Sequence, residues 1–189
     1  CRMFAPVFEA ASEKHADIGD ADALDREMCI LEAVGMSPAA FVVEPVQGEA
    51  GGVVPPPDYL PRVREICTRH GTLLIADEIQ TGMGRTGTLW GVDHEGVTPD
   101  IMCMGKSLGG GVMPLAAFVA TPTIWEVMIP NPIIHSTTFG GNPIACAAGI
   151  ASHDGPIGAK DRPFGDPATA IAFDAALAVS ALALLSEQA

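Results

Sequence analysis

The segment TLLIADE, residues 72–78, combines a short apolar run with two consecutive acids. His70 and Gly71 precede this run, and the glycine-rich loop TGMGRTG, residues 81–87, begins shortly after it. A short apolar run bounded by turn residues is typical of a strand buried in a parallel sheet. We therefore predict a buried strand at residues 72–76 whose carboxyl end carries Asp77 and Glu78.

Three similar apolar runs lie on either side of this strand. The run before it ends at Glu44, and the first of the two that follow ends near Lys106; the predicted strands are AAFVV at 39–43, DIMCM at 100–104 and LAAFVA at 115–120. Helical patterns lie between and around them. This order predicts an α/β domain with a mostly parallel sheet and flanking helices.

Apolar spacing places two of the helices at residues 21–34 and 58–70. In the first, Leu24, Met28, Leu31 and also Ile30 are expected to face inward; in the second, Asp58 is the expected N-cap and Tyr59, Leu60, Val63, Ile66 and Cys67 recur at helical spacing. Two further helices are expected to begin at Thr121-Pro122 and Asn142-Pro143, where a capping residue precedes a proline. Residues 1–151 form the predicted domain, and residues 152–189 form a divergent or unrelated tail that is partly helical.

Composition narrows the class of protein. Of 189 residues, 48% are apolar and 17% are charged, and no apolar run reaches the length of a membrane-spanning helix. The net charge is −13, and the ten Lys and Arg residues form no basic cluster, which argues against a nucleic-acid partner. The acidity is compatible with steering of cationic substrates, but solubility alone explains it better.

The cysteines bear on the cellular compartment of the protein, and the N-terminus bears on the extent of the chain. Five cysteines are scattered without a CxxC pattern or metal-ligand spacing, so we expect reduced core thiols in a cytoplasmic protein. The N-terminus, CRMFAPVFEA, has neither an initiator Met nor the features of a signal peptide, and we expect a chain cut from a longer sequence.

Polar groups gather where the predicted strands end. Because the functional groups of α/β sheets collect at the carboxyl ends of strands, Glu44, Asp77 and Lys106 are expected in one crevice. An amine held in a dry pocket loses its proton more readily and can attack a carbonyl, which Schiff-base chemistry requires. The alternative for Lys106 is a lysine that snorkels to solvent at a strand end.

Asp77 needs a cationic or donor partner at such a position. A protonated pyridine nitrogen would suit it, since an aspartate there keeps a pyridoxal ring acting as an electron sink. A salt bridge to Arg85 or a helix cap is the alternative.

The segment HSTTFGGNP, residues 135–143, brings hydroxyls and glycines to a predicted helix start, which favours a phosphate, although an ordinary capped turn has the same residues. His94 and His135 lack the spacing of metal ligands, so no catalytic metal is expected.

Four motifs then occur in a fixed order: EPVQGEAGG at 44–52, ADEIQTGMGRTG at 76–87, GKSLGGG at 105–111 and STTFGGNP at 136–143. Together they resemble the class III pyridoxal-phosphate-dependent aminotransferases over about residues 39–151, and most of all the ornithine, acetylornithine and putrescine branch. The resemblance implies the large domain of the fold type I transferases and pyridoxal 5'-phosphate as cofactor.

The resemblance also implies roles for individual residues. Lys106 would hold the cofactor as a Schiff base and move protons, Asp77 would pair with the pyridinium nitrogen, and Gln80 would bond the ring hydroxyl. Thr138 would bind the cofactor phosphate of the neighbouring subunit, which implies a homodimer with the active site at its interface.

Glu49 would help to bind the substrate, and Glu44, at the start of the same motif, would support the site. The implied reaction moves an amino group from an ornithine-like or diamine donor to a 2-oxo acid such as 2-oxoglutarate. A non-catalytic fragment or pseudoenzyme is one alternative, because the family's upstream phosphate cup and its downstream carboxylate-binding arginine are missing. An aminomutase or decarboxylase with the same cofactor is the other.

Overall fold

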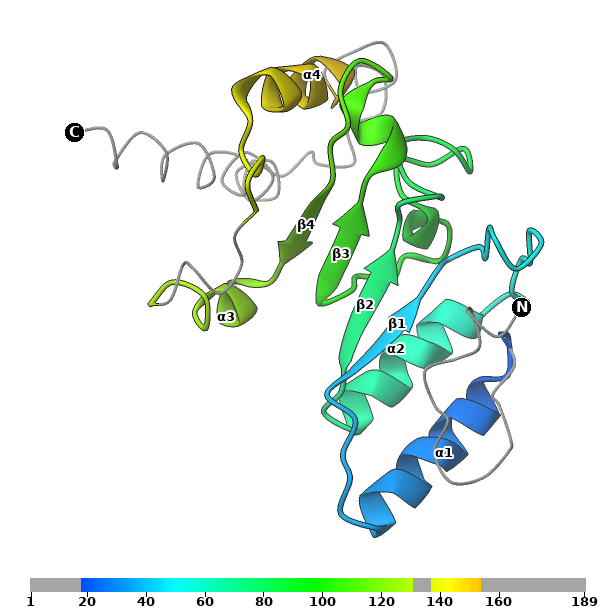
Figure 1. Ribbon diagram of the computed structural model, residues 1–189. Helices are drawn as coiled ribbons and strands as arrows, with labels where there is room; N and C mark the ends of the chain where they lie inside the picture. The colour runs from blue at the N-terminus through cyan, green and yellow to red at the C-terminus, as the bar shows by residue number, and fades with distance from the viewer. Residues whose placement is uncertain (1–17, 131–136, 154–189) are drawn as a thin grey trace.

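The computed structural model describes residues 18–130 and 137–153 and has a four-stranded sheet at its centre (Figure 1). The strands lie in the order β1 (Ala40–Val43), β2 (Leu73–Asp77), β3 (Ile101–Met104) and β4 (Ala117–Ala120). The first three are parallel, with Val43 opposite Ala76 and Ala76 opposite Met102, whereas β4 runs antiparallel to β3. The prediction of a mostly parallel sheet is confirmed.

The helices follow the predicted order. They are α1 (Ala21–Ala33), α2 (Tyr59–Arg69), α3 (Pro122–Trp125) and α4 (Pro143–His153), with short 3-10 turns η2 (Gly91–Glu95) and η3 (Lys106–Gly109). In α2 all five residues expected to face inward are buried. The core joins α1, α2 and the sheet, and its most buried members include Met28, Val63, Cys67, Leu74 and Ala76.

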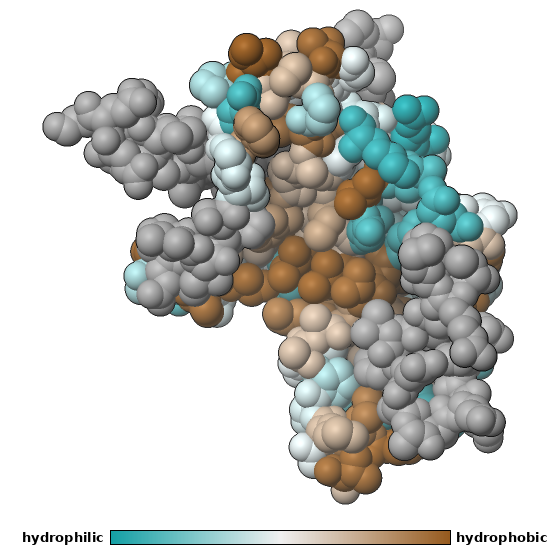
Figure 2. All heavy atoms as spheres, in the orientation of Figure 1, coloured by the Kyte–Doolittle hydropathy of each residue, from teal (hydrophilic) through white to brown (hydrophobic). Residues whose placement is uncertain are grey.

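The two faces of the sheet differ in burial. Along β2, Leu74 and Ala76 are buried, while Leu73, Ile75 and Asp77 on the opposite face are only partly buried. Apolar residues gather over the middle of the molecule in the space-filling view (Figure 2). We refer to the Leu74 and Ala76 side as the packed face and to the Ile75 and Asp77 side as the open face.

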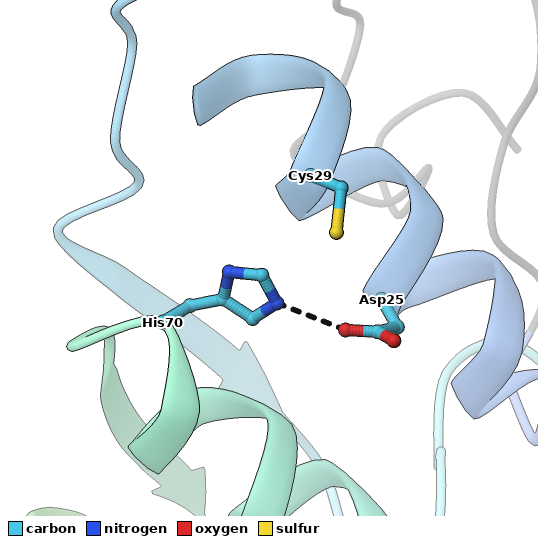
Figure 3. A group of neighbouring side chains, drawn as sticks. All are labelled: Asp25, Cys29 and His70. Atoms are coloured by element: carbon cyan, nitrogen blue, oxygen red, sulfur yellow. Dashed lines mark hydrogen bonds and ion pairs between the residues drawn. The ribbon is translucent and has the colours of Figure 1, made fainter. Parts of the chain in front are cut away.

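Polar contacts join α1 to the end of α2. The His70 imidazole lies between the two helices, with Nε2 2.9 Å from Asp25 Oδ1 (Figure 3). Its Nδ1 is 2.9 Å from Glu32 Oε1. The hydrogen bond to Asp25, supported by the one to Glu32, raises the pKa of His70, and the same contact with His70 lowers the pKa of Asp25. Arg69 also contacts Asp25.

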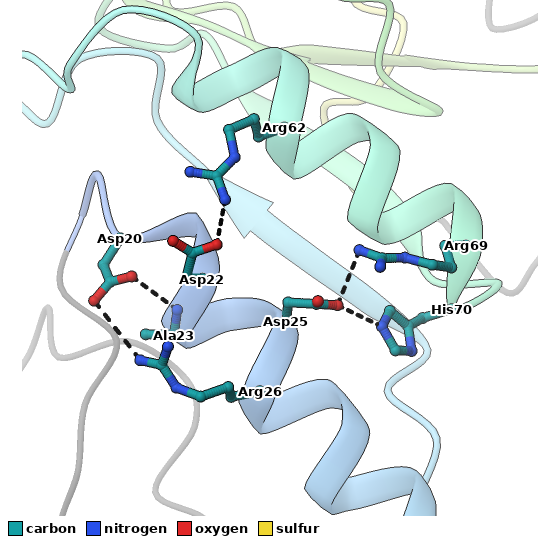
Figure 4. A network of polar contacts seen from close by, with 8 residues as sticks. All are labelled: Asp20, Asp22, Ala23, Asp25, Arg26, Arg62, Arg69 and His70. Carbon is teal, nitrogen blue, oxygen red and sulfur yellow. Dashed lines mark hydrogen bonds and ion pairs between the residues drawn. The ribbon is translucent and has the colours of Figure 1, made fainter.

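The other contacts of this network lie at the start of α1 (Figure 4). Asp20 caps the helix by accepting from the Ala23 amide at 2.8 Å, and Arg62 of α2 reaches Asp22. The two helices are therefore tied at both ends by charged side chains, and between those ends by apolar packing.

Three expectations about burial are wrong. Ile30 is 55% exposed, because it lies about 200° around the helix from Met28, which points into the core. Val42 is 52% exposed, since β1 is an edge strand of the described sheet and its second face is uncovered. Cys29 is exposed and not part of the core, although Cys29, Cys67, Cys103 and Cys146 are all free thiols.

The helix caps follow the predicted positions with differences in detail. Asn142 Oδ1 accepts from the amides of Ile144 and Ala145 at 3.0 and 3.2 Å, as a capping side chain should. Asp58 and Thr121 stand at N-cap positions but make no capping side-chain bond.

No helix among the described residues is long and apolar enough to cross a membrane. The expected tail beyond His153, together with Cys1 and His135, lies outside the described residues.

Candidate active site

The carboxyl ends of the three parallel strands meet at one edge of the sheet (Figure 1). Glu44 follows β1 directly, Asp77 is the last residue of β2, and Lys106 begins η3 two residues beyond β3. The edge at which the sequence predicts a crevice thus carries Glu44, Asp77 and Lys106.

Lys106 is exposed at this edge, and not enclosed in a dry pocket within the described part of the chain. Its Nζ donates to Gln80 Oε1, which joins two of the predicted site residues. Its backbone has φ of +46°, a left-handed conformation that is rare for a residue with a side chain. Such strain persists only where surrounding contacts impose it, and it is found preferentially at functional sites.

The contacts that impose this conformation lie around Ser107. Arg85 donates from Nε and from a terminal guanidinium nitrogen to Ser107 Oγ, at 3.2 and 3.0 Å, and the Ser107 carbonyl accepts from Ser152 Oγ at 3.3 Å. Leu108, the next residue, is buried in the core. The turn that begins at Lys106 is therefore held by Arg85 of the loop after β2 and by Ser152 of α4. Leu108 anchors it in the core.

Asp77 lies on the open face beside Cys103, its register partner on β3. Its Oδ1 accepts from the Ile79 amide at 3.0 Å, and no residue of the described segments bonds Oδ2. Burial raises the pKa of the Cys103 thiol, and the negative charge of Asp77 raises it further. The alternative for Asp77, a salt bridge to Arg85, is not present among the described residues, and Arg85 binds Ser107 instead.

Glu78 has a different role that sequence reasoning missed. It is 1% exposed, and its carboxylate accepts from the amides of Gly91 and Val92, each at 2.9 Å, and from the Thr81 hydroxyl. Consecutive residues of a strand point to opposite faces, and Glu78 directly follows β2 with its amide still bonded to the Cys103 carbonyl of β3, so the two acids point to opposite sides. That alternation is the signal that could have separated Glu78, a buried anchor for η2, from Asp77.

The loop after β1 packs against Gln80. Glu44 Oε2 accepts from the Gly48 amide at 3.1 Å, which closes the start of the loop. A Cβ at Gly48 would lie 2.9 Å from Gln80 Cγ, so only glycine allows this approach without a shift. Glu49 follows in the same loop and is exposed.

Thr138 is exposed in the turn that precedes α4. The helix itself lies against η3, where a Cβ at Gly149 would come within 2.5 Å of Leu115 and the Ser152 hydroxyl bonds Ser107. Within the described residues no hydrogen bond joins Thr138 to Lys106, Asp77 or Gln80. The structure thus brings Lys106 and Gln80 together, with Asp77 and Glu44 at the same edge, and shows, in the part of the chain that it describes, no bond from Thr138 to any of them.

Comparisons with known proteins cover the part of the chain that carries the four motifs. The family model described as "Aminotransferase class-III" matches residues 4–154. A putrescine aminotransferase of Pectobacterium atrosepticum is 51% identical over 151 residues, which are 80% of this chain and 32% of that protein. The chain therefore spans about a third of the length of this curated relative.

Solved structures agree in fold. The acetylornithine aminotransferase of Elizabethkingia anophelis is 45% identical, with a TM-score of 0.67, over 74% of this chain and 35% of that one. The ornithine aminotransferase of Toxoplasma gondii is 44% identical, with a TM-score of 0.65, over 74% of this chain and 31% of that one. The fold is part of the fold type I transferase domain, as predicted. With the family model covering most of its length, this chain belongs to the class III aminotransferases.

Proposed function

We propose that this chain forms the central, cofactor-binding part of a pyridoxal-phosphate-dependent aminotransferase. The observation that carries the proposal is the exposed Lys106 amine, hydrogen-bonded to Gln80 and located at the same strand-end edge as Asp77. Family membership supports it, because class III aminotransferases use this cofactor.

The residues at this edge fit the groups of pyridoxal 5'-phosphate. The cofactor has an aldehyde, a ring hydroxyl, a pyridine nitrogen and a phosphate. Lys106 Nζ is accessible to the aldehyde, Gln80 offers an amide to the hydroxyl, and Asp77 Oδ2 lacks a partner from the described segments, as a carboxylate reserved for a pyridinium nitrogen would. We assign the phosphate to Thr138 of the neighbouring subunit in a homodimer, a geometry in which Thr138 need not approach its own Lys106.

The bound cofactor would supply an electron sink for electrons released at the substrate carbon. Lys106 would act on that carbon as the proton carrier, since its side chain is exposed at the edge where the cofactor would lie. Arg85 and Ser107 would keep the base of the turn that begins at Lys106 in place. Asp77 would hold the ring nitrogen in its protonated form through its negative charge.

The donor proposed is an ornithine-like amino acid or a diamine, and the acceptor is a 2-oxo acid such as 2-oxoglutarate. Relatives named for putrescine, ornithine and acetylornithine support this class. Such donors carry an amino group at each end of an aliphatic chain, and in some of them one of these two amino groups is modified. Glu49 is exposed and free to meet a distal ammonium group, and Glu44 shapes the loop that presents it.

Covalent trapping tests the cofactor assignment. The purified chain is mixed with pyridoxal phosphate, reduced with borohydride and digested, and mass spectrometry locates the modified lysine. We expect the label on Lys106 and its loss in Lys106→Ala, with Lys160→Ala as the matched control. Label distributed equally over Lys14, Lys106 and Lys160 would refute Lys106 as the cofactor lysine.

Product analysis tests the reaction. Incubation with ornithine or putrescine and 2-oxoglutarate should yield glutamate. Release of carbon dioxide would favour a decarboxylase, and amino migration without an acceptor would favour an aminomutase. A chain that traps the cofactor on Lys106 but yields no product would be a non-catalytic fragment, which is the remaining alternative because the chain spans about a third of its relative.

A further inference from the structure

Three different ligand types meet between α1 and the end of α2 (Figure 3). A carboxylate oxygen of Asp25, the Sγ of Cys29 and a ring nitrogen of His70 all lie within 4.8 Å of one another. Asp25 and Cys29 are four residues apart, so they project from the same face of α1. We propose that these three side chains form a zinc-binding site.

A second observation supports the site independently of the three ligand atoms. His70 Nδ1 is 2.9 Å from Glu32 Oε1, while Nε2 points at Asp25. Metal-binding histidines almost always use their other ring nitrogen in this way, because the carboxylate fixes the ring and its tautomer. Only 6% of the His70 side chain is exposed, so the ring is already held in one orientation.

The donor set favours zinc over the other common metals. Oxygen, nitrogen and sulfur ligands suit Zn²⁺, whereas Mg²⁺ and Ca²⁺ prefer oxygen alone. A tetrahedral zinc requires ligand atoms about 3.3 to 3.7 Å apart. The Nε2 to Oδ1 distance of 2.9 Å must open slightly, and the exposed Cys29 side chain must approach by at most about 1.5 Å, which a side-chain rotation supplies.

Arg69 is the cation nearest this group, at 3.0 Å from Asp25 Oδ1. Its side chain is 59% exposed, and a carboxylate offers about four acceptor positions on two oxygens. Asp25 can therefore keep Arg69 and bind a metal, although the positive charge weakens the site. Binding would release the thiol proton of Cys29 and any proton on His70 Nε2 to solvent, and water would complete the coordination.

The proposed site is separate from the lysine edge. His70 precedes β2 at its amino end, whereas Asp77 closes the same strand at its carboxyl end. A strand of this length spans roughly 16 Å, so a metal here would join α1 to α2 without touching the cofactor residues. Its effect would be to stabilise the packing of α1.

Calorimetric titration of the purified chain with zinc chloride, without pyridoxal phosphate, tests the proposal. We expect saturable binding of one zinc per chain, loss of that binding in His70→Ala and Cys29→Ser, and retention in Cys146→Ser. Titration with Co²⁺ should produce a thiolate charge-transfer band that disappears in Cys29→Ser alone among the two cysteine variants. Circular dichroism of each variant verifies its folding.

Two further variants distinguish a preorganised zinc site from nonspecific zinc binding. Glu32→Gln should weaken zinc binding by about 10- to 100-fold, because His70 loses its orienting partner. Arg69→Gln should strengthen it, since a nearby positive charge is removed. Absence of saturable binding, or binding that survives in Cys29→Ser or is indifferent to Glu32→Gln, would overturn the proposal.

Discussion

The packed and open faces of the sheet place two neighbouring carboxylates in opposite environments. Glu78 is buried, and all its contacts are with the chain itself: two amides and a hydroxyl. Asp77 accepts one amide, and its second oxygen meets no partner in the described segments. A carboxylate that is bonded through both oxygens to its own chain stabilises a loop, whereas one with an unbonded oxygen can serve a ligand. Two consecutive residues at the end of β2 thus differ in what their carboxylates bind.

The largest expected effect on stability is that of Leu74→Ala on the packed face. This side chain is 1% exposed and lies within the core. Its truncation should lower the free energy of unfolding by about 2 to 5 kcal/mol, whereas Ile75→Ala, one residue along on the open face, should cost clearly less. Urea unfolding of both variants measures the difference. Equal losses would show that the open face is as well packed as the other.

A smaller loss of stability is expected from Glu78→Gln. Glutamine keeps one acceptor oxygen and presents an NH₂ group to at least one of the donors that Glu78 now binds. The mismatch should cost about 1 to 3 kcal/mol of unfolding free energy. Asp77→Asn is the matched control and should change stability little. If Glu78→Gln were neutral, water or a rearranged η2 would have to satisfy those donors.

Asp77→Asn should instead affect the proposed reaction. Loss of the charged partner of the ring nitrogen should reduce transamination by about 10- to 100-fold, while cofactor binding stays detectable. The initial rate of glutamate formation and the absorbance of bound cofactor measure the two quantities. Near-normal turnover would remove Asp77 from its assigned role.

Gly82→Ala tests how tightly the loop after Glu78 is packed. A Cβ at this position would lie 2.7 Å from the Trp90 ring and 2.8 Å from the Glu78 carbonyl oxygen. Because a backbone atom cannot move aside easily, we expect a loss of about 1 to 3 kcal/mol. Gly87→Ala is not a neutral control, since Gly87 has φ of +100°; Gly105→Ala, with no contact closer than 3.6 Å, serves better for stability.

The smallest effect is expected at the surface pair of Arg62 and Asp22. The two side chains are 48% and 68% exposed, so water screens their attraction. Asp22→Asn should change the free energy of unfolding by less than about 1 kcal/mol, and added salt should reduce even that. A larger loss, measured by urea unfolding at low and high salt, would mean that this charge pair stabilises α1 more than an exposed ion pair ordinarily does.

The sequence by itself determined the strands, the order of the elements and the edge that carries Asp77 and Lys106. Apolar periodicity and turn residues are local properties, and the carboxyl ends of parallel strands always meet at one edge. The inward residues of α2 were also predicted in full, because a helix with one apolar stripe has a single way to face a core.

Only the tertiary structure decided the rest. The direction of β4, the exposure of Val42 and the diverging roles of Asp77 and Glu78 depend on which neighbours cover each face, and neighbours distant in sequence leave no local pattern. The contact of Lys106 with Gln80, and the meeting of Cys29 with His70, join residues separated by 26 and 41 positions. The packing of the loops between these residues determines both contacts. No single segment of the sequence encodes that packing.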